Sequence, residues 1–208
     1  MKIGVLGTGM VGEAIASKLV ALGHEVMMGS RDAKNPRATA WAKRAGGRAQ
    51  MGTFADSAAF AEMLFNCTHG ASSLEALRSA GEKPLRGKVL IDVANILPPA
   101  QSGPWSLGEE IQNAFPETKV VKALNTMNCH IMIDPSKVGG SNTVFMSGND
   151  LDAKKKVREL LGSFGWDDII DVGDIGTARA VESYLPLWMA LWKTLGTADF
   201  NIKVVRKS

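Results

Sequence analysis

Three glycines near the start of the chain are spaced as G-x-G-x-x-G. The segment that carries them reads Gly7-Thr8-Gly9-Met10-Val11-Gly12. It follows the apolar run Lys2–Leu6, typical of a strand, and opens an amphipathic pattern over Met10–Leu22, typical of a helix. In that setting the first glycine permits a tight turn, the second lets a pyrophosphate approach the backbone, and the third lets the helix pack on the strand. Free N–H groups and the helix dipole would hold the anion, so the spacing predicts a dinucleotide-binding loop.

Gly29-Ser30-Arg31 stands at the expected end of the second strand, where doubly wound folds select their nucleotide. Folds that prefer NAD usually place an aspartate or glutamate there, to hold the ribose 2′-hydroxyl. The hydroxyl of Ser30 and the cationic fork of Arg31 instead suit a 2′-phosphate, and Thr8 offers a second hydroxyl. We therefore predict NADP(H) as the cofactor. Asp32 leaves the other assignment open, because a shift of one or two residues would make it the ribose ligand.

Polar residues also follow the later strands, at the edge where doubly wound folds bind their ligands. Thr68 and His69 follow the fourth predicted strand, and we expect both beside the cofactor. Asn95 and Asn125 follow two further strands and are expected at the nicotinamide end. His69, His130 and Cys67 are the candidates for proton transfer, the two histidines because imidazole titrates near neutral pH. A surface or structural role is the alternative for each histidine.

Other kinds of chemistry find little support in the sequence. Cys67 and Cys129 are far apart and form no C-x-x-C motif, so we expect two buried, unreactive thiols in a reducing compartment. The cysteines and the three histidines lack the spacing of a zinc site, and no metal is predicted. Tyr184 is the single tyrosine and is followed four residues later by Trp188, so the Tyr-x-x-x-Lys dyad of short-chain dehydrogenases is missing.

Strand-like and helix-like segments alternate along most of the chain, which predicts an α/β fold with a doubly wound parallel sheet of the Rossmann type. The predicted strands are Lys2–Leu6, Glu25–Met28, Arg48–Met51, Met63–Cys67, Lys88–Val93, Val120–Leu124, Thr143–Met146 and Asp168–Val172. The predicted helices include Met10–Leu22, Pro36–Ala45, Phe54–Ala61, Ser73–Ser79, a segment that Ser106 and Glu109 open as a capping box, and Leu151–Leu161 ending at Gly162.

The chain divides into two predicted parts. Residues 1–148 form the dinucleotide-binding domain, and residues 149–208 form a small strand-plus-helix region that packs on it. Within that region, residues 178–196 are predicted to form a helix that is apolar nearly all the way round. Such a helix is expected to be buried on more than one side, against its own domain, in a homodimer contact, or as a lid over a ligand.

The charge and hydropathy of the chain exclude several kinds of partner. Its 24 basic and 21 acidic residues give a net charge of +3, and no basic arm stands out, so nucleic acid is not a predicted partner. No segment approaches the ~20 consecutive apolar residues that a membrane span requires. We expect a soluble, cytoplasmic protein that acts on a small molecule.

Several motifs together resemble a known family. They are the glycine loop, Gly23-His24-Glu25-Val26 leading to Gly29-Ser30-Arg31, Val121-Lys122-Ala123-Leu124-Asn125-Thr126, Leu185-Pro186-Leu187-Trp188, and Phe200-Asn201-Ile202-Lys203. The chain resembles the NADP oxidoreductases that depend on the deazaflavin coenzyme F420. The reductase domain of the STEAP metalloreductases is similar in the same places. The end of the fourth strand, Cys67-Thr68-His69-Gly70, departs from the valine-proline type common among relatives, which leaves the second substrate open.

This resemblance implies hydride transfer between NADPH and a flavin-like ring, in a cleft between the Rossmann domain and the C-terminal element. It matches Thr8, Ser30 and Arg31 to the positions that hold the 2′-phosphate. It matches Asn125 and Thr126 to the segment that lines the nicotinamide side. We therefore expect an NADPH-dependent oxidoreductase with a flavin or deazaflavin as second substrate. The alternative is a non-catalytic NADP(H)-sensing domain that contacts a partner through its apolar C-terminal helix.

Overall fold

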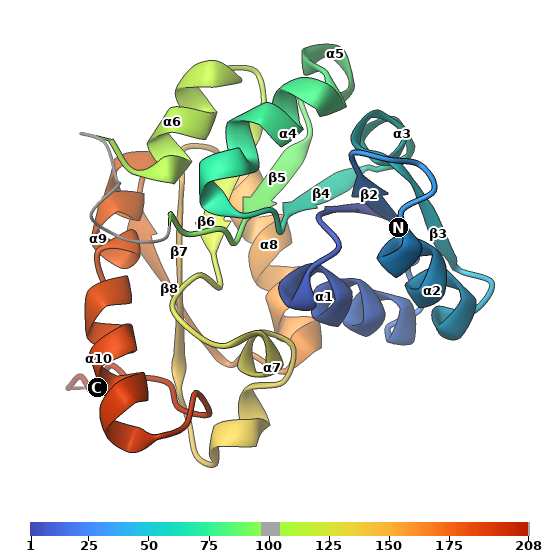
Figure 1. The fold of residues 1–208 in the computed structure, drawn as a ribbon. Helices are drawn as coiled ribbons and strands as arrows, with labels where there is room; N and C mark the ends of the chain where they lie inside the picture. Colours follow the sequence, from blue (N-terminus) through green and yellow to red (C-terminus); the bar gives the residue numbers. More distant parts are fainter. Residues whose placement is uncertain (97–104, 208) are drawn as a thin grey trace.

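One sheet holds the strands of the computed structural model, which describes residues 1–96 and 105–207. The strand order is β3-β2-β1-β4-β5-β6-β7-β8 (Figure 1). The strands are β1 (Lys2–Leu6), β2 (Glu25–Ser30), β3 (Ala49–Thr53), β4 (Met63–Asn66), β5 (Val89–Asp92), β6 (Lys119–Ala123), β7 (Thr143–Gly148) and β8 (Asp168–Gly173). Each predicted strand is present, with bounds that agree to within two residues. The order switches sides between β1 and β4, so the loop after β1 lies where doubly wound folds bind ligands.

The doubly wound α/β fold is confirmed, with one departure from a wholly parallel sheet. Strands β1 to β6 run parallel, but β7 runs antiparallel to β6, with Val121 opposite Gly148. A parallel neighbour needs a crossover, usually a helix that traverses the sheet. The connection from β6 to β7 holds instead the four-residue helix α7 (Cys129–Met132) and a 3-10 helix at Pro135–Val138. The chain therefore turns back at the same edge of the sheet.

Helices cover both faces of the sheet, as this architecture requires. They are α1 (Met10–Ala21), α2 (Pro36–Ala45), α3 (Phe54–Phe60), α4 (Ser73–Ala80), α5 (Glu82–Leu85), α6 (Leu107–Ala114), α8 (Leu151–Phe164), α9 (Ala178–Glu182) and α10 (Leu185–Leu195). One apolar core buries Ile15 of α1 together with Leu161 of α8. The second core, on the other face, buries Leu77 of α4 together with Ile111 of α6. Among the described residues, no helix has the length and apolar character needed to cross a membrane.

Side-chain caps start several helices, and one of these caps is predicted from the sequence. The capping box at α6 is confirmed, because the Ser106 hydroxyl accepts from the Glu109 amide and the Glu109 carboxylate accepts from the Ser106 amide. The predicted end of α8 at Gly162 is wrong. The helix continues through Phe164 and ends at Gly165, whose φ of +107° lies in the left-handed region. A glycine adopts that conformation without the steric penalty of a Cβ, so Gly165 rather than Gly162 terminates the helix.

The single C-terminal helix predicted over residues 178–196 is two helices in the structure. Helix α9 ends at Glu182 and α10 begins at Leu185. Pro186 explains the break, because in a continuous helix its ring would clash with the carbonyl of Glu182, four residues earlier, and it lacks an N–H to donate. At the start of α10, where amides have no partner within the helix, the same proline is well tolerated.

Helix α10 is exposed within the chain, so its own domain does not bury it on more than one side; the homodimer and lid alternatives stay predictions. Leu187 is 56% exposed, Trp192 49% and Leu195 54%, and no residue of the helix is buried. Trp188 stacks on Phe200 at 5.6 Å between ring centroids, which joins α10 to the C-terminal segment. That segment is itself held along the sheet, where the Thr143 amide donates to the Ile202 carbonyl at 2.9 Å. The other side of α10 faces solvent.

Candidate functional site

The glycine loop between β1 and α1 is packed so tightly that two of its positions admit only glycine. Gly7 has a φ of +118°, and a Cβ built there would lie 2.6 Å from the carbonyl oxygen of Cys67. A Cβ on Gly12 would lie 2.1 Å from the carbonyl oxygen of Gly7. Contacts below 3.0 Å are essentially never made by real Cβ atoms. Gly7 therefore allows the turn against β4, and Gly12 allows α1 to approach that turn.

Gly9 differs from the other two glycines because its surroundings are open. A Cβ built on it would meet no atom within 4 Å. Gly9 is the residue that precedes the first turn of α1, and no side chain caps the helix there. The first-turn N–H groups are therefore left for water or a ligand, at the positive end of the helix dipole. An anion such as a pyrophosphate fits this arrangement.

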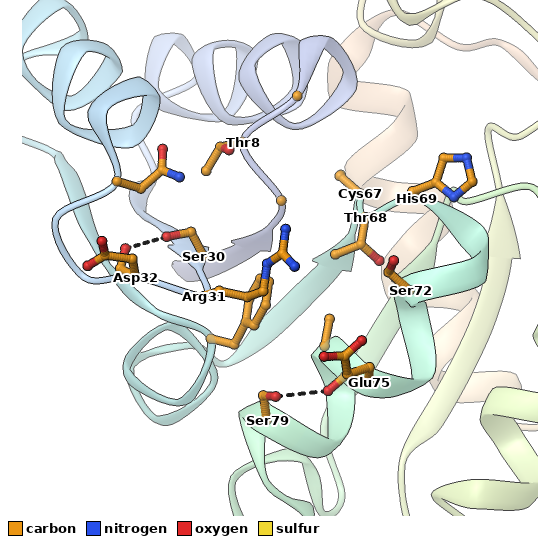
Figure 2. A pocket seen from close by; sticks show the side chains of 15 residues that line it. Thr8, Ser30, Arg31, Asp32, Cys67, Thr68, His69, Ser72, Glu75 and Ser79 are labelled. Atoms are coloured by element: carbon orange, nitrogen blue, oxygen red, sulfur yellow. Dashed lines mark hydrogen bonds between the residues drawn. The ribbon is translucent and has the colours of Figure 1, made fainter.

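A cavity of about 380 Å³ opens beside this loop (Figure 2). Its walls are the glycine loop, the end of β2, the end of β4 and one side of α4. Its lining residues are Gly7, Thr8, Gly9, Ser30, Arg31, Asp32, Asn35, Phe54, Cys67, Thr68, His69, Ser72, Glu75, Ala76 and Ser79. The structure thus brings together seven of the residues predicted to bind the cofactor, from three separate stretches of sequence. Sequence reasoning missed the wall from α4, although Ser72, Glu75, Ala76 and Ser79 have the spacing of one helix face.

The end of β2 presents a cation and a hydroxyl to the cavity, with the carboxylate of Asp32 engaged in a turn. Figure 2 shows Arg31 extending into the space between the glycine loop and α4. Asp32 Oδ1 accepts from the Lys34 amide at 2.8 Å. Ser30 Oγ donates a hydrogen bond to the Asp32 carbonyl at 2.5 Å. A phosphate oxygen that accepts a hydrogen bond from Ser30 must therefore replace the Asp32 carbonyl as the acceptor. Arg31 is the cationic side chain at this wall.

The residues predicted at the nicotinamide end form a separate pair that does not line the cavity. Asn95 Nδ2 donates to the carbonyl of Asn125 at 2.7 Å, and Asn125 Nδ2 donates to Asn95 Oδ1 at 3.1 Å. They join the loops that follow β5 and β6. Just before Asn125, Leu124 has a φ of +64°, a left-handed backbone that is uncommon and strained for leucine. Such outliers gather at functional sites, which supports a role for this pair.

The remaining predicted residues lie in varied surroundings. Met10 and Val11 belong to the first turn of α1, where Met10 is 82% exposed. His69 is exposed at the cavity, on the opposite side from Ser30 (Figure 2). His130 is exposed on α7 and does not line the cavity.

Both cysteines are free and buried, as predicted. Burial, with a further contribution from the nearby Asp92 carboxylate, raises the pKa of the Cys67 thiol far above its usual range. Burial also raises the pKa of Cys129. Since the thiolate is the reactive form, both thiols are held in their inert state.

Sequence reasoning also missed a buried ion pair at the ends of β5 and β6. Lys122 and Asp92 have no exposed surface, and Lys122 Nζ lies 2.8 Å from Asp92 Oδ2 and 2.9 Å from Glu182 Oε1. Burial lowers the pKa of Lys122, but the two carboxylates outweigh burial and raise it, so the lysine is charged. The sequence feature that could have revealed this ion pair is a single charged residue inside an otherwise apolar strand, Val120-Val121-Lys122-Ala123. Buried charges are rare unless they are paired.

Comparison with known proteins matches residues 2–96 to the family model described as NADP oxidoreductase, coenzyme F420-dependent. A crystal structure from Arthrobacter sp. FB24, described as a candidate F420-dependent NADP reductase, is 48% identical to the chain. The two structures agree with a TM-score of 0.93, over 99% of this chain and 100% of the other.

Two curated relatives extend the match. The F420-dependent NADP reductase of Methanocaldococcus jannaschii is 28% identical and is covered over 96% of its length, with 95% of this chain. Metalloreductase STEAP3 of Rattus norvegicus is 30% identical over 90% of this chain. The chain spans only 38% of that metalloreductase. The agreement with the reductases, by contrast, runs from end to end. The chain therefore belongs to the family of F420-dependent NADP oxidoreductases.

Proposed function

We propose that the chain transfers a hydride between NADP(H) and a flavin or deazaflavin acceptor such as coenzyme F420. The observation that carries this proposal is the cavity beside the glycine loop, which combines an anion-binding helix end with Arg31 at the end of β2. Neither an aspartate nor a glutamate stands at position 30 or 31, and the Asp32 carboxylate is engaged with the Lys34 amide. This wall favours a phosphate on the ribose over a free 2′-hydroxyl.

The residues present fit an extended dinucleotide with two phosphate-bearing regions. Gly9 and the first turn of α1 would hold the pyrophosphate, and Thr8, Ser30 and Arg31 would hold the 2′-phosphate. Asn95 and Asn125 would line the nicotinamide end. When bound, NADPH supplies a hydride and NADP⁺ accepts one. The chain's own contribution is to orient the reactants, which is the main task of a protein when a cofactor carries the chemistry.

A flat-ring acceptor is supported by two observations. The Methanocaldococcus jannaschii relative, matched nearly end to end, is named an F420-dependent NADP reductase. Among the described residues that line the cavity, His69 is the one imidazole, and it is exposed. Hydride transfer between two rings requires alignment more than it requires a proton-transfer dyad. These features suit an acceptor of the flavin or deazaflavin kind.

Turnover with a panel of acceptors tests the proposed function. NADPH and NADH are each mixed with F420, FMN, FAD or a ferric chelate, and the loss of the reduced-nicotinamide absorbance band is followed. We expect NADPH to be oxidised in the presence of F420 or a flavin, and NADH to react far more slowly. Tight NADPH binding with no turnover on any acceptor would contradict an enzymatic role and favour the NADP(H)-sensing alternative.

The exposed apolar surface of α10 supports a homodimer, and we propose that this helix forms the contact. The helix has 11 residues, and none of them is buried. Its exposed apolar side chains are Leu187, Met189, Trp192 and Leu195. Contiguous apolar surface of this kind marks interaction sites on proteins. The same surface is also the feature that favours the sensing alternative, in which another protein covers α10.

Trp192→Glu is expected to convert a dimer into a monomer, because a charge would be buried without a partner in the contact. Light scattering coupled to size-exclusion chromatography would give the molar mass of two chains for the wild type and of one chain for the variant. Trp105→Glu is the matched control, since Trp105 is equally exposed, at 52%, but lies outside α10. A wild-type mass of one chain at every concentration would overturn the dimer proposal.

The cytoplasmic location and the division at residue 148 stay predictions.

A further inference from the structure

Lys122 occupies the centre of a buried network that the proposed hydride transfer does not use directly. Lys122 and Asp92 are paired in the register of β5 and β6, which brings their side chains together on one face of the sheet. Lys122 Nζ donates to Asp92 Oδ2 at 2.8 Å, to Glu182 Oε1 at 2.9 Å, and to the carbonyl oxygen of Ala94. These three partners satisfy the three donors of the ammonium group. Each partner belongs to a different segment: β5, α9 and the loop after β5.

In one direction the network reaches the cofactor cavity. Asp92 Oδ1 accepts from Asn66 Nδ2 at 2.8 Å. Asn66 Oδ1 accepts in turn from Thr68 Oγ1 at 2.7 Å, and Thr68 lines the cavity. Asn66 has no exposed surface, and its bond to Asp92 is buried, whereas Thr68 is partly exposed at the cavity. A change in the position of Asp92 is therefore transmitted to Thr68 through two hydrogen bonds.

In the other direction the network holds the C-terminal helices. Glu182 is the last residue of α9, and its carboxylate accepts from the amides of Leu107 at 2.8 Å and Gly108 at 3.0 Å, in the first turn of α6. The neighbouring Val181 carbonyl accepts from Asn125 Nδ2 at 3.3 Å. Helix α10 follows only three residues after Glu182. The position of α9, and of the chain leading into α10, thus depends on Lys122 and Asn125.

The chemistry of the network indicates a role in positioning. Two carboxylates surround one ammonium group, and the excess negative charge is met by the amides at the start of α6. Replacing such a buried group with apolar side chains of similar volume is often neutral or stabilising, so stability alone is a poor reason to bury it. What the charges add is a defined geometry between segments that are distant in sequence. The strained backbone of Leu124 lies between Lys122 and Asn125, the two residues that bond to α9.

We propose that Lys122 is a positioning residue that couples the cofactor cavity to α9, and so fixes the C-terminal helices relative to the bound dinucleotide. This inference rests on the proposed NADP(H) site. If α9 opens, Glu182 leaves Lys122, and the contacts to Ala94, Asp92, Asn66 and Thr68 loosen with it. A cofactor that binds only the ordered cavity must then oppose the opening of α9, by linkage.

Amide hydrogen exchange with and without saturating NADP⁺ tests this coupling without any acceptor. In the wild type we expect NADP⁺ to slow exchange about fivefold or more both in residues 7–12 and in residues 178–182. In Lys122→Met the slowing should persist in residues 7–12 and fall below about twofold in residues 178–182, because the methionine cannot link α9 to Asp92.

Lys154→Met is the matched control. Lys154 is also a buried lysine, paired with Asp171 at 2.8 Å, but it joins α8 to β8 and has no bond to the network. NADP⁺ should slow exchange in both segments of this variant, as in the wild type. Glu182→Gln, which keeps the Lys122–Asp92 pair, takes the place of Lys122→Met if that variant does not fold, and the same loss at residues 178–182 is expected.

The outcomes separate the inference from the function on which it rests. Wild-type protection in residues 7–12 without protection in residues 178–182 would overturn the coupling and leave NADP(H) binding intact. Retained protection of residues 178–182 in Lys122→Met would overturn it as well. Protection of neither segment in the wild type would refute NADP(H) binding itself, and the coupling would fall with it.

Discussion

Gly12→Ala should raise the Kd for NADPH by roughly 100-fold and lower the free energy of unfolding by about 3 kcal/mol. The added Cβ would lie 2.1 Å from the Gly7 carbonyl oxygen, so α1 and the loop must separate. That movement displaces the first-turn amides from the place where the pyrophosphate is expected. Urea unfolding gives the change in stability, and a fluorescence titration gives the Kd.

Two other glycines serve as controls for this result. Gly162→Ala lies within α8, where a Cβ meets no atom within 4 Å, and should leave NADPH binding unchanged while adding about 0.5–1 kcal/mol of helix stability. Gly9→Ala should leave stability nearly unchanged, because its surroundings are open, and still weaken binding, since the methyl group points where the cofactor would approach. Normal NADPH affinity in both Gly9→Ala and Gly12→Ala would mean that the loop does not hold the pyrophosphate.

Arg31→Ala should weaken NADPH binding about 50-fold and change NADH binding less than about threefold. The variant loses the charge-assisted hydrogen bonds to the 2′-phosphate, which contribute about 1.5–3 kcal/mol, and NADH lacks that group. Titrations of both cofactors against the wild type and the variant give the two ratios. The wild type should show a clear preference for NADPH that the variant loses.

Arg37→Ala is the control for the loss of charge. Arg37 is exposed in the first turn of α2 and does not line the cavity, so its removal should alter NADPH binding less than about threefold. Equal affinity of the wild type for NADPH and NADH would contradict the assignment of Arg31. So would a loss of less than about tenfold in Arg31→Ala. Either result would return attention to Asp32 as a ligand of the ribose.

Much of the fold follows from local patterns in the sequence. Every strand and the α6 capping box were predictable because apolar runs, turn residues and caps act over a few neighbouring positions. The direction of β7 was not predictable, because alternation along a strand does not report which way it runs beside its neighbour. The break between α9 and α10 was readable from Pro186, since a proline inside a helical pattern interrupts the backbone hydrogen bonds.

The candidate site likewise has one part that was predictable from the sequence and one part that was not. The glycine loop and Ser30–Arg31 were predictable because a single strand-turn-helix unit sets their geometry. The network around Lys122 joins residues 66, 92, 122 and 182, and its members meet only when β4, β5, β6 and α9 are assembled. No local spacing links them. A lone lysine in an apolar strand predicts a buried partner without saying which one.

The reversal of β7 has a consequence for engineering. Because β7 turns back beside β6, its first residue lies near the edge where the parallel strands end, and the segment at Ile202 is bonded to it there. The C-terminal segment at Ile202 thus returns to the edge of the sheet that carries the glycine loop, although the two segments are far apart in the sequence. A mutant library confined to residues 185–206 would therefore leave the nucleotide-recognition residues untouched. It would vary a surface at the same edge of the sheet, so that surface and the nucleotide-recognition residues can be varied separately.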